Sequence, residues 1–292
     1  MPVGLFIDMA DFSIVISLRP NDAGDYNNRG IDNAKKGKYD KAIADFTKAI
    51  KLSPSDAGVY NNRGITYGHK GEYDKSIVDF TMAMELNPRN AELYTNRGVS
   101  YGNKGENYKA LADFTKAIEL DPKDAEAYNN RGSIYGEGEY DKAIADYTRA
   151  IELSPKYARV YINRGITYGH KGEYDKSIVD FTMAMELNPR NAEAYANRGV
   201  AYVKKGENDK AIADFTKAIE LDPKHAEAYY NRGVTCRCRG EYRNAIADLT
   251  RVISINPNFV EAYINRGLAY SEKGENNKAM FDFRKVEELK LK

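Results

Sequence analysis

The tripeptide Asn-Arg-Gly recurs along this chain of 292 residues at a nearly constant spacing. Successive glycines are 34 residues apart, with one step of 33, and they are Gly30, Gly64, Gly98, Gly132, Gly165, Gly199, Gly233 and Gly267. A fixed period of this length predicts a solenoid, in which each unit buries its apolar face against its neighbours. The spacing therefore favours one array of eight units over two globular domains.

We place the unit boundaries seven residues before each glycine. The eight units are then 23–56, 57–90, 91–124, 125–157, 158–191, 192–225, 226–259 and 260–292. The segment from Met9 to Pro20 aligns with the second half of a unit, so we expect residues 1–22 to be a degenerate half-repeat that acts as an N-terminal cap. The fourth unit lacks one residue in its turn, which predicts a local distortion there.

Each unit carries the pattern of two antiparallel helices, which makes the fold class all-α. Tyrosine is the fourth residue, glycine the eighth and usually tyrosine the eleventh, as in Tyr94, Gly98 and Tyr101. This spacing puts the three residues on one helical face. A second helix follows, with small residues flanking an aromatic residue. Glycine at the fifteenth residue and a later proline, as in Gly105 and Pro122, predict the ends of the two helices.

The order Tyr, Gly, Tyr, Ala, Phe, Ala, Pro over 34 residues resembles the tetratricopeptide repeat, from Ala23 to Lys292. The resemblance implies a right-handed superhelical solenoid of antiparallel helix pairs, with the first helices lining a concave groove. It also implies a non-enzymatic scaffold for protein–protein interaction. Residues Asn62 to Glu92 are identical to Asn163 to Glu193, so a block of the array was evidently copied.

Asparagine is the sixth residue of every unit, where it should face the groove together with the second, fifth, ninth, twelfth and thirteenth residues. A carboxamide pairs with both polar groups of a peptide unit, whatever the side chains of that peptide are. A ladder of asparagines would therefore hold an extended polypeptide by its backbone. The expected peptide-binding residues are Asn62, Asn96, Asn130, Asn163, Asn197 and Asn231, with apolar Val99, Ile166 and Val200. The alternative is that each asparagine only bonds a neighbouring helix.

The ladder is similar to the one in the repeat domain of the O-linked N-acetylglucosamine transferases, whose unit pattern Tyr161 to Gly165 resembles. That resemblance implies only a polypeptide-binding function, since nothing in the chain resembles the transferase domain. Arginine replaces the leucine that is usual there. The lysine and arginine clamp by which other tetratricopeptide domains hold chaperone tails is missing.

An arginine beside each packing glycine is matched by an aspartate in each second helix. Partly buried charges persist when they are paired, so we expect structural ion pairs rather than an anion site. The pairs include Arg131 with Asp146 and Arg164 with Asp180.

The composition limits the classes of partner that we expect the chain to bind. Lysine and arginine number 44 against 43 aspartates and glutamates, so the net charge of +1 gives no general attraction to nucleic acid or to membranes. No signal peptide or membrane span is expected, and the two cysteines, Cys236 and Cys238, mildly favour a reducing cytoplasm. We expect no cofactor, no metal site and no catalytic residue, because no such motif is present.

A second class of function is self-association. The array begins with an apolar half-unit that includes Phe12 and Ile14, and it lacks a polar terminal helix. Its ends would then stack into homo-oligomers.

Overall fold

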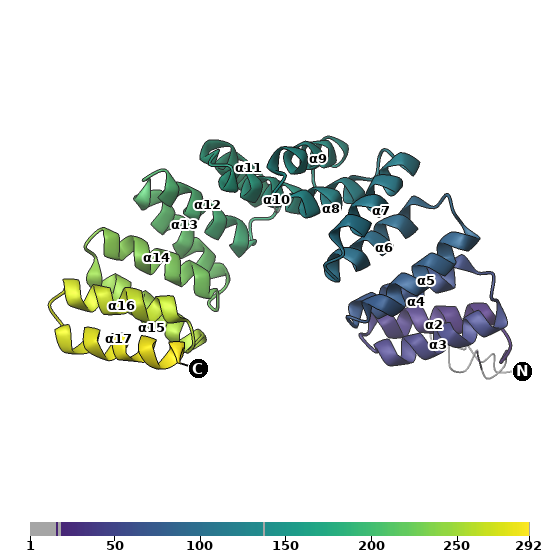
Figure 1. Ribbon diagram of the computed structural model, residues 1–292, viewed down its shortest axis with the longest axis horizontal. Helices are drawn as coiled ribbons and strands as arrows, with labels where there is room; N and C mark the ends of the chain where they lie inside the picture. The colour runs from purple at the N-terminus through teal and green to yellow at the C-terminus, as the bar shows by residue number, and fades with distance from the viewer. Residues whose placement is uncertain (1–15, 17–18, 137, 292) are drawn as a thin grey trace, which may run out of the picture. The chain divides into compact units, whose positions relative to one another are not determined.

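A computed structural model of the protein describes residue 16, residues 19–136 and residues 138–291. These residues form sixteen α-helices, α2 to α17, and no β-strand. Two compact units, Met1–Glu137 and Gly138–Lys292, divide the chain in the turn of the fourth repeat. The fold is an all-α solenoid of repeated antiparallel helix pairs, as the sequence predicts (Figure 1).

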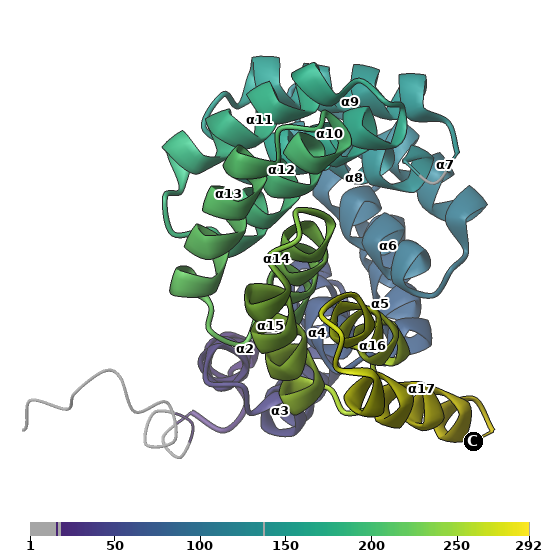
Figure 2. The ribbon, with the colours of Figure 1, turned by 90° about the vertical axis from the view of Figure 1, so that its left-hand side faces the viewer.

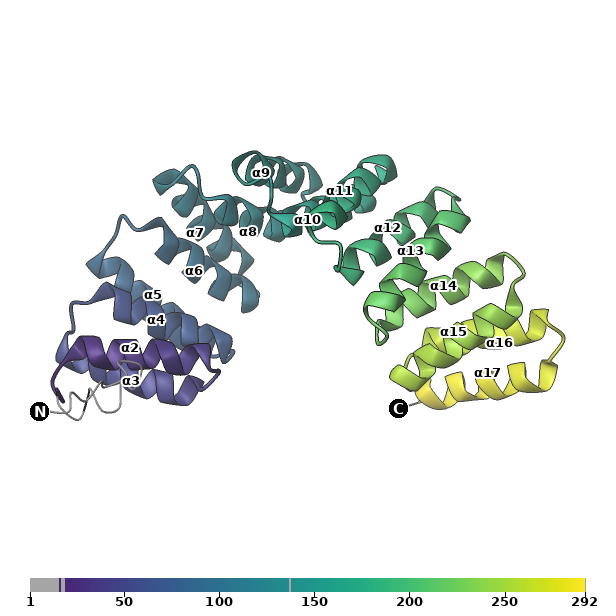
Figure 3. The ribbon, with the colours of Figure 1, turned by 180° about the vertical axis from the view of Figure 1, so that it is seen from behind.

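In the first compact unit, first and second helices of the repeats alternate. They are α2 (Ala23–Lys35), α3 (Tyr39–Leu52), α4 (Ala57–His69), α5 (Tyr73–Leu86), α6 (Ala91–Asn103), α7 (Asn107–Leu120) and α8 (Ala125–Tyr135). Helices α2, α4 and α6 each pack on their own second helix and on the next first helix, so that α2, α4, α6 and α8 form one layer (Figure 3).

The second compact unit repeats this arrangement. Its helices are α9 (Tyr140–Leu153), α10 (Ala158–His170), α11 (Tyr174–Leu187), α12 (Ala192–Lys204), α13 (Asn208–Leu221), α14 (Ala226–Cys238), α15 (Tyr242–Ile255), α16 (Val260–Glu272) and α17 (Asn276–Lys290). Helices α10, α12, α14 and α16 form the layer of first helices, and Figure 2 shows the last pairs, α14 with α15 and α16 with α17.

In seven repeats the glycine at the eighth residue lets the two helices of a pair approach closely. A Cβ atom on Gly64 would lie 2.9 Å from Cε1 of Phe80, and one on Gly199 would lie 2.6 Å from Cε1 of Phe215. Both phenylalanine rings are buried, so moving them to admit a methyl group would disturb close packing. Glycine is therefore required at this position by packing.

Turns between the helices follow the sequence signals. Seven of the glycines at the fifteenth residue have φ between 70° and 87°, a conformation that residues with a Cβ rarely adopt. Asp56, Asn90 and Asp124 accept hydrogen bonds from backbone N–H groups in the first turn of the next helix, and so act as its N-cap.

Charged side chains link successive turns. Lys70 contacts Asp40 of the preceding repeat and Glu72 of its own, both at 2.7 Å. Lys205 contacts Asp175 and Glu207 in the same way. These groups are at the surface, so salt should weaken their contribution.

The fourth repeat differs from the others. Its first helix, α8, has 11 residues, whereas the other first helices have 13. The shortening coincides with the missing residue and with the division between the two compact units. The predicted N-terminal half-repeat, Phe12 and Ile14 included, lies almost wholly outside the described residues and stays a prediction.

Replacing Gly64 by alanine should lower the free energy of unfolding by about 1–3 kcal/mol, because the new methyl group overlaps the buried Phe80 ring. Gly68 on the same helix is the matched control, since a Cβ there would lie 3.5 Å from Oγ of Ser76, an ordinary contact. Gly68→Ala should leave stability unchanged or raise it by up to about 1 kcal/mol through helix propensity. Urea denaturation followed by circular dichroism measures both, and equal effects of the two changes would contradict the packing argument.

Candidate functional site

The exposed face of the first helices carries the asparagines at the sixth residue of each repeat. The expectation that the fifth residue also faces outward is wrong for several repeats. Thr95, Asn129, Ile162 and Ala196 are all buried. The fifth residue lies against the next first helix, at the level of its asparagine, and so decides what that asparagine contacts.

Three of the asparagines bond the fifth residue of the preceding repeat. The side-chain amide of Asn62 donates to Oδ1 of Asn27 at 3.0 Å, and that of Asn96 donates to Oδ1 of Asn61 at 3.1 Å. The amide of Asn265 donates to the hydroxyl of Tyr230 at 3.0 Å. In these repeats the asparagine helps to join neighbouring first helices.

Among the described residues, Asn197 and Asn231 have no such partner, because the fifth residue of the repeat before each of them is apolar. Ile162 is the fifth residue of the repeat before Asn197, and Ala196 is the fifth residue of the repeat before Asn231. Neither carboxamide forms a hydrogen bond with any residue that the structure describes, and both are half-buried. The amide nitrogen of Asn130 is also without a partner within the described residues.

The remaining predicted peptide-binding residues lie on the same face. Asn163 is half-buried in α10. Val99 and Val200, at the ninth residue of their repeats, are 37% and 36% exposed, and Ile166 is half-buried. Leu268, at the corresponding position of α16, is also 36% exposed and was not among the residues predicted from the sequence, although its place in the repeat identifies it.

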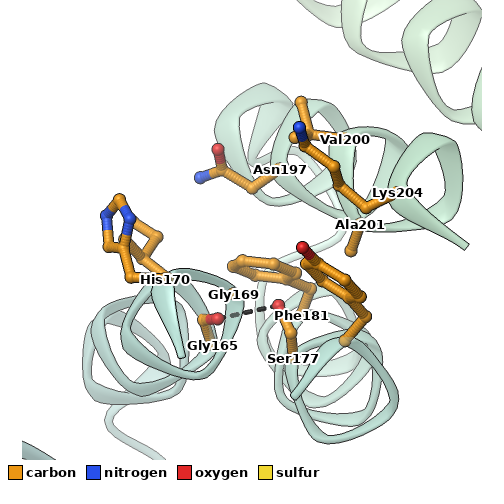
Figure 4. Close-up of a pocket in the computed structure, with 11 residues that line it drawn as sticks. Gly165, Gly169, His170, Ser177, Phe181, Asn197, Val200, Ala201 and Lys204 are labelled. Carbon is orange, nitrogen blue, oxygen red and sulfur yellow. Dashed lines mark hydrogen bonds between the residues drawn. The ribbon is translucent and has the colours of Figure 1, made fainter. Parts of the chain in front are cut away.

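A pocket of about 270 Å³ opens between α10, α11 and α12. Its apolar lining includes Ile166, Phe181 and Val200. Figure 4 shows Asn197 and His170 extending toward the opening above the Phe181 ring. A free carboxamide, an apolar surface and a hollow therefore meet at one place in the second compact unit.

The arginines that follow the asparagines are held inside the fold. Arg164 donates from Nε and Nη2 to both carboxylate oxygens of Asp180, each at 2.8 Å. Its Nη1 donates to Oγ1 of Thr148 on the preceding second helix at 3.0 Å. The Arg164 guanidinium therefore joins three helices. The threonine is a site residue that the sequence-based prediction lacks, although it recurs with the same period.

The same arginine–aspartate geometry recurs through both compact units. The pairs are Arg29–Asp45, Arg63–Asp79, Arg97–Asp113, Arg164–Asp180, Arg198–Asp214, Arg232–Asp248 and Arg266–Asp282. The hydrogen bonds that Arg198 donates to the Asp214 carboxylate raise the pKa of its guanidinium, although burial opposes the shift. Arg131 donates to Thr115 within the first compact unit, whereas Asp146 belongs to the second, so their predicted pairing stays a prediction.

The cysteines and histidines do not form a metal site. Cys236 is buried beside Ala245 and Ala269, and burial raises the pKa of its thiol to about 11. Cys238 is exposed. His69 stacks on Tyr39 and His170 on Tyr140. Within the described part of the chain, no group of three histidine, cysteine, aspartate or glutamate side chains is placed to hold a metal ion.

Helix α17 exposes several large apolar side chains. Met280 is 52% exposed and Phe281 is 67% exposed. The prediction of homo-oligomers through the array ends stays a prediction. None of the helices in the described residues is both long enough and apolar enough to cross a membrane.

Family comparison identifies the repeat. Three related family descriptions match the chain. "Tetratricopeptide repeat" matches residues 57–90, 91–124, 192–225 and 226–259, and a second description of that name matches 114–145 and 249–281. "TPR repeat" matches 33–71, 135–172 and 170–206. Together these matches run from residue 33 to residue 281. No curated protein sequence gives a significant match.

Solved structures show the same architecture. The crystal structure of MamA is 32% identical, with a TM-score of 0.51, and the match covers 53% of this chain and 90% of that one. A tetratricopeptide repeat protein from Parabacteroides merdae is 24% identical, with a TM-score of 0.65, covering 85% and 98%. The Cut9–Hcn1 hetero-tetramer of the APC/C is 21% identical, with a TM-score of 0.64, covering 86% and 50%. The last two show likeness of fold alone.

Breaking one arginine–aspartate pair should be costly, because it leaves a buried charge alone. We expect Arg164→Leu and Asp180→Leu each to lower the free energy of unfolding by about 3 kcal/mol or more. The double variant should lose about 1–3 kcal/mol less than the sum of the two single variants. The exposed pair of Lys217 and Glu220 is the control, where Lys217→Ala should change stability by under about 1 kcal/mol. Strict additivity of the Arg164 and Asp180 effects in urea denaturation would refute the coupling.

The two thiols should differ in reactivity. At pH 8 the folded protein should react rapidly with one equivalent of Ellman's reagent at Cys238, while the buried Cys236 thiol stays protonated and covered. The second equivalent should react only in denaturant. Cys238→Ser should abolish the rapid reaction and Cys236→Ser should preserve it. Rapid reaction of both thiols in the folded parent would show that Cys236 is accessible.

Proposed function

Because this chain belongs to the tetratricopeptide repeat family, whose repeats form protein–protein interaction scaffolds, we propose that its first helices bind an extended segment of a protein partner. The observation that carries this proposal is a pair of carboxamides on adjacent helices that no described residue engages, Asn197 on α12 and Asn231 on α14. A carboxamide that the fold does not engage is available to a ligand, and a peptide backbone supplies both a donor and an acceptor for it.

The spacing of the helices suits an extended chain. Adjacent packed helices lie about 8–10 Å apart, and an extended peptide advances about 3.4 Å per residue. Asn197 and Asn231 would therefore meet peptide units about three residues apart. Apolar Val200 lies one helical turn after Asn197 and offers a contact for a side chain of the bound segment.

The proposal uses only part of the predicted asparagine ladder. Asn62 and Asn96 already use one amide hydrogen within the fold, so they have less to offer a ligand than Asn197 and Asn231. At about 1 kcal/mol net per hydrogen bond, less the cost of ordering the peptide, a few such rungs give micromolar affinity at best. A readily reversible interaction scaffold fits this affinity.

Replacing Asn197 and Asn231 together by alanine should weaken the binding of a fluorescent, unstructured peptide pool by about tenfold or more, because each change removes about 1 kcal/mol or more of hydrogen bonding. Fluorescence anisotropy measures the binding, after circular dichroism has shown that each variant is folded.

Two further double variants serve as comparisons. Asn276 and Asn277 on α17 are exposed and form no hydrogen bond within the described residues, so Asn276→Ala with Asn277→Ala should bind like the parent. Asn62→Ala with Asn96→Ala should lose less binding than the Asn197 and Asn231 variant. Unchanged binding by the Asn197 and Asn231 variant would place the peptide on another surface.

A further inference from the structure

The pocket between α10, α11 and α12 has a polar rim that backbone recognition does not require. His170 and Lys204 line it, and both stand at the thirteenth residue of their repeats, at the ends of neighbouring first helices. Lys204 is exposed and forms no ion pair or hydrogen bond with any residue that the structure describes. The adjacent Lys205, by contrast, contacts both Asp175 and Glu207. Lys204 is thus a cation beside an apolar hollow that nothing in the described fold neutralises.

The first compact unit has a pocket at the equivalent place. It has a volume of about 240 Å³, and Ile31, Phe46 and Ile65 line it. Its rim again carries one lysine and one histidine at thirteenth residues, Lys35 and His69. Lys35 also has no ion-pair partner among the described residues. Because the lysine and the histidine stand in the opposite order here, this pair is not a simple copy of the other pocket.

We propose that each pocket takes one apolar side chain of the bound segment and that the lysine on its rim selects an acidic residue nearby in that segment. This inference rests on the proposed function and adds the chemistry of the partner. The volumes of about 270 and 240 Å³ lie below the roughly 300–1,000 Å³ of small-molecule sites, which favours a single side chain as the occupant.

The spacing of the acid from the apolar residue follows from the geometry of an extended chain. Side chains of residues i and i+2 point to the same side and lie about 6.8 Å apart. Asn197 and Lys204 are seven residues apart on α12, which corresponds to about 10.5 Å along the helix axis. Because the segment crosses α12, Lys204 lies to one side of it, and its flexible amine reaches a carboxylate that points to the same side as the apolar side chain in the pocket. The preferred segment therefore contains an apolar residue and an acidic residue separated by one position.

Charges at the N-terminal ends of the first helices also favour placing the acidic residue of the ligand near Lys204. Glu193, Glu227 and Glu261 are exposed at the second residues of α12, α14 and α16. An acidic residue of the ligand is repelled there and attracted at the end where Lys204 lies. Lysine in a last turn also stabilises its own helix, but that role predicts no effect on ligand choice.

The experiment compares two labelled peptides in a glycine and serine background. One contains leucine and aspartate separated by one residue, and the other has asparagine in place of the aspartate. We expect the parent protein to bind the aspartate peptide about three- to fivefold more tightly in low salt, with the preference shrinking at high salt. Lys204→Gln should remove the part of the preference that the pocket between α10, α11 and α12 supplies. Lys204→Gln with Lys35→Gln should abolish the preference.

The matched control is Lys217→Gln, which changes the net charge equally on the outer helix α13 and should keep the full preference. Equal binding of the two peptides by the parent, or a preference that survives in the double lysine variant, overturns the inference. If both peptides bind and Asn197→Ala with Asn231→Ala weakens both, the proposed function stands even when the acidic preference fails. If neither peptide binds, both proposals fall.

Discussion

A guanidinium group held between three helices is the interaction that organises this fold. Arg198 donates to both oxygens of Asp214 on the second helix of its own repeat and to Thr182 on the second helix of the preceding repeat. The threonine hydroxyl in turn donates to the carbonyl of Ile178. Because charged and polar groups lose their water on burial, each needs all of these partners at once. One arginine therefore fixes the arrangement of a helix pair and its attachment to the pair before it.

This network explains why the repeat is so uniform. The arginine lies next to the packing glycine, and the aspartate precedes the core aromatic residue, as in Arg198 beside Gly199 and Asp214 beside Phe215. A shift of one helix by a single residue would separate the ion pair and also bring the aromatic ring out of register with the glycine. Polar bonding and close packing thus select the same register, which is the consistency that specifies one structure.

The sequence alone could predict the helix pairs, their ends and the arginine–aspartate pairing, because these depend on contacts at a fixed spacing within one repeat. It could not predict which asparagines are free. That outcome depends on the residue 35 positions earlier, which is Asn27 for Asn62 but Ile162 for Asn197. Only the relative placement of two first helices shows that the fifth residue of one lies beside the sixth of the next. Where the fifth residue is buried and apolar, as at Ile162 and Ala196, the next asparagine has no side-chain partner there.

The copied block shows how identical segments acquire different surroundings. Ser76 and Ser177 are copies of one residue, and each donates to the carbonyl of a packing glycine. Next to Ser76 the following first helix presents Ser100, whose hydroxyl lies 2.9 Å away, whereas next to Ser177 it presents Ala201, which lines the pocket. Alanine is smaller and apolar, so it leaves space at the bottom of the pocket and removes the hydrogen bond that Ser100 forms. One helical turn further on, Lys204 stands where the other copy has Asn103. Since residues of two neighbouring repeats line the pocket, duplication of one repeat does not by itself duplicate the pocket. Divergence of the adjoining helix is enough to change the lining.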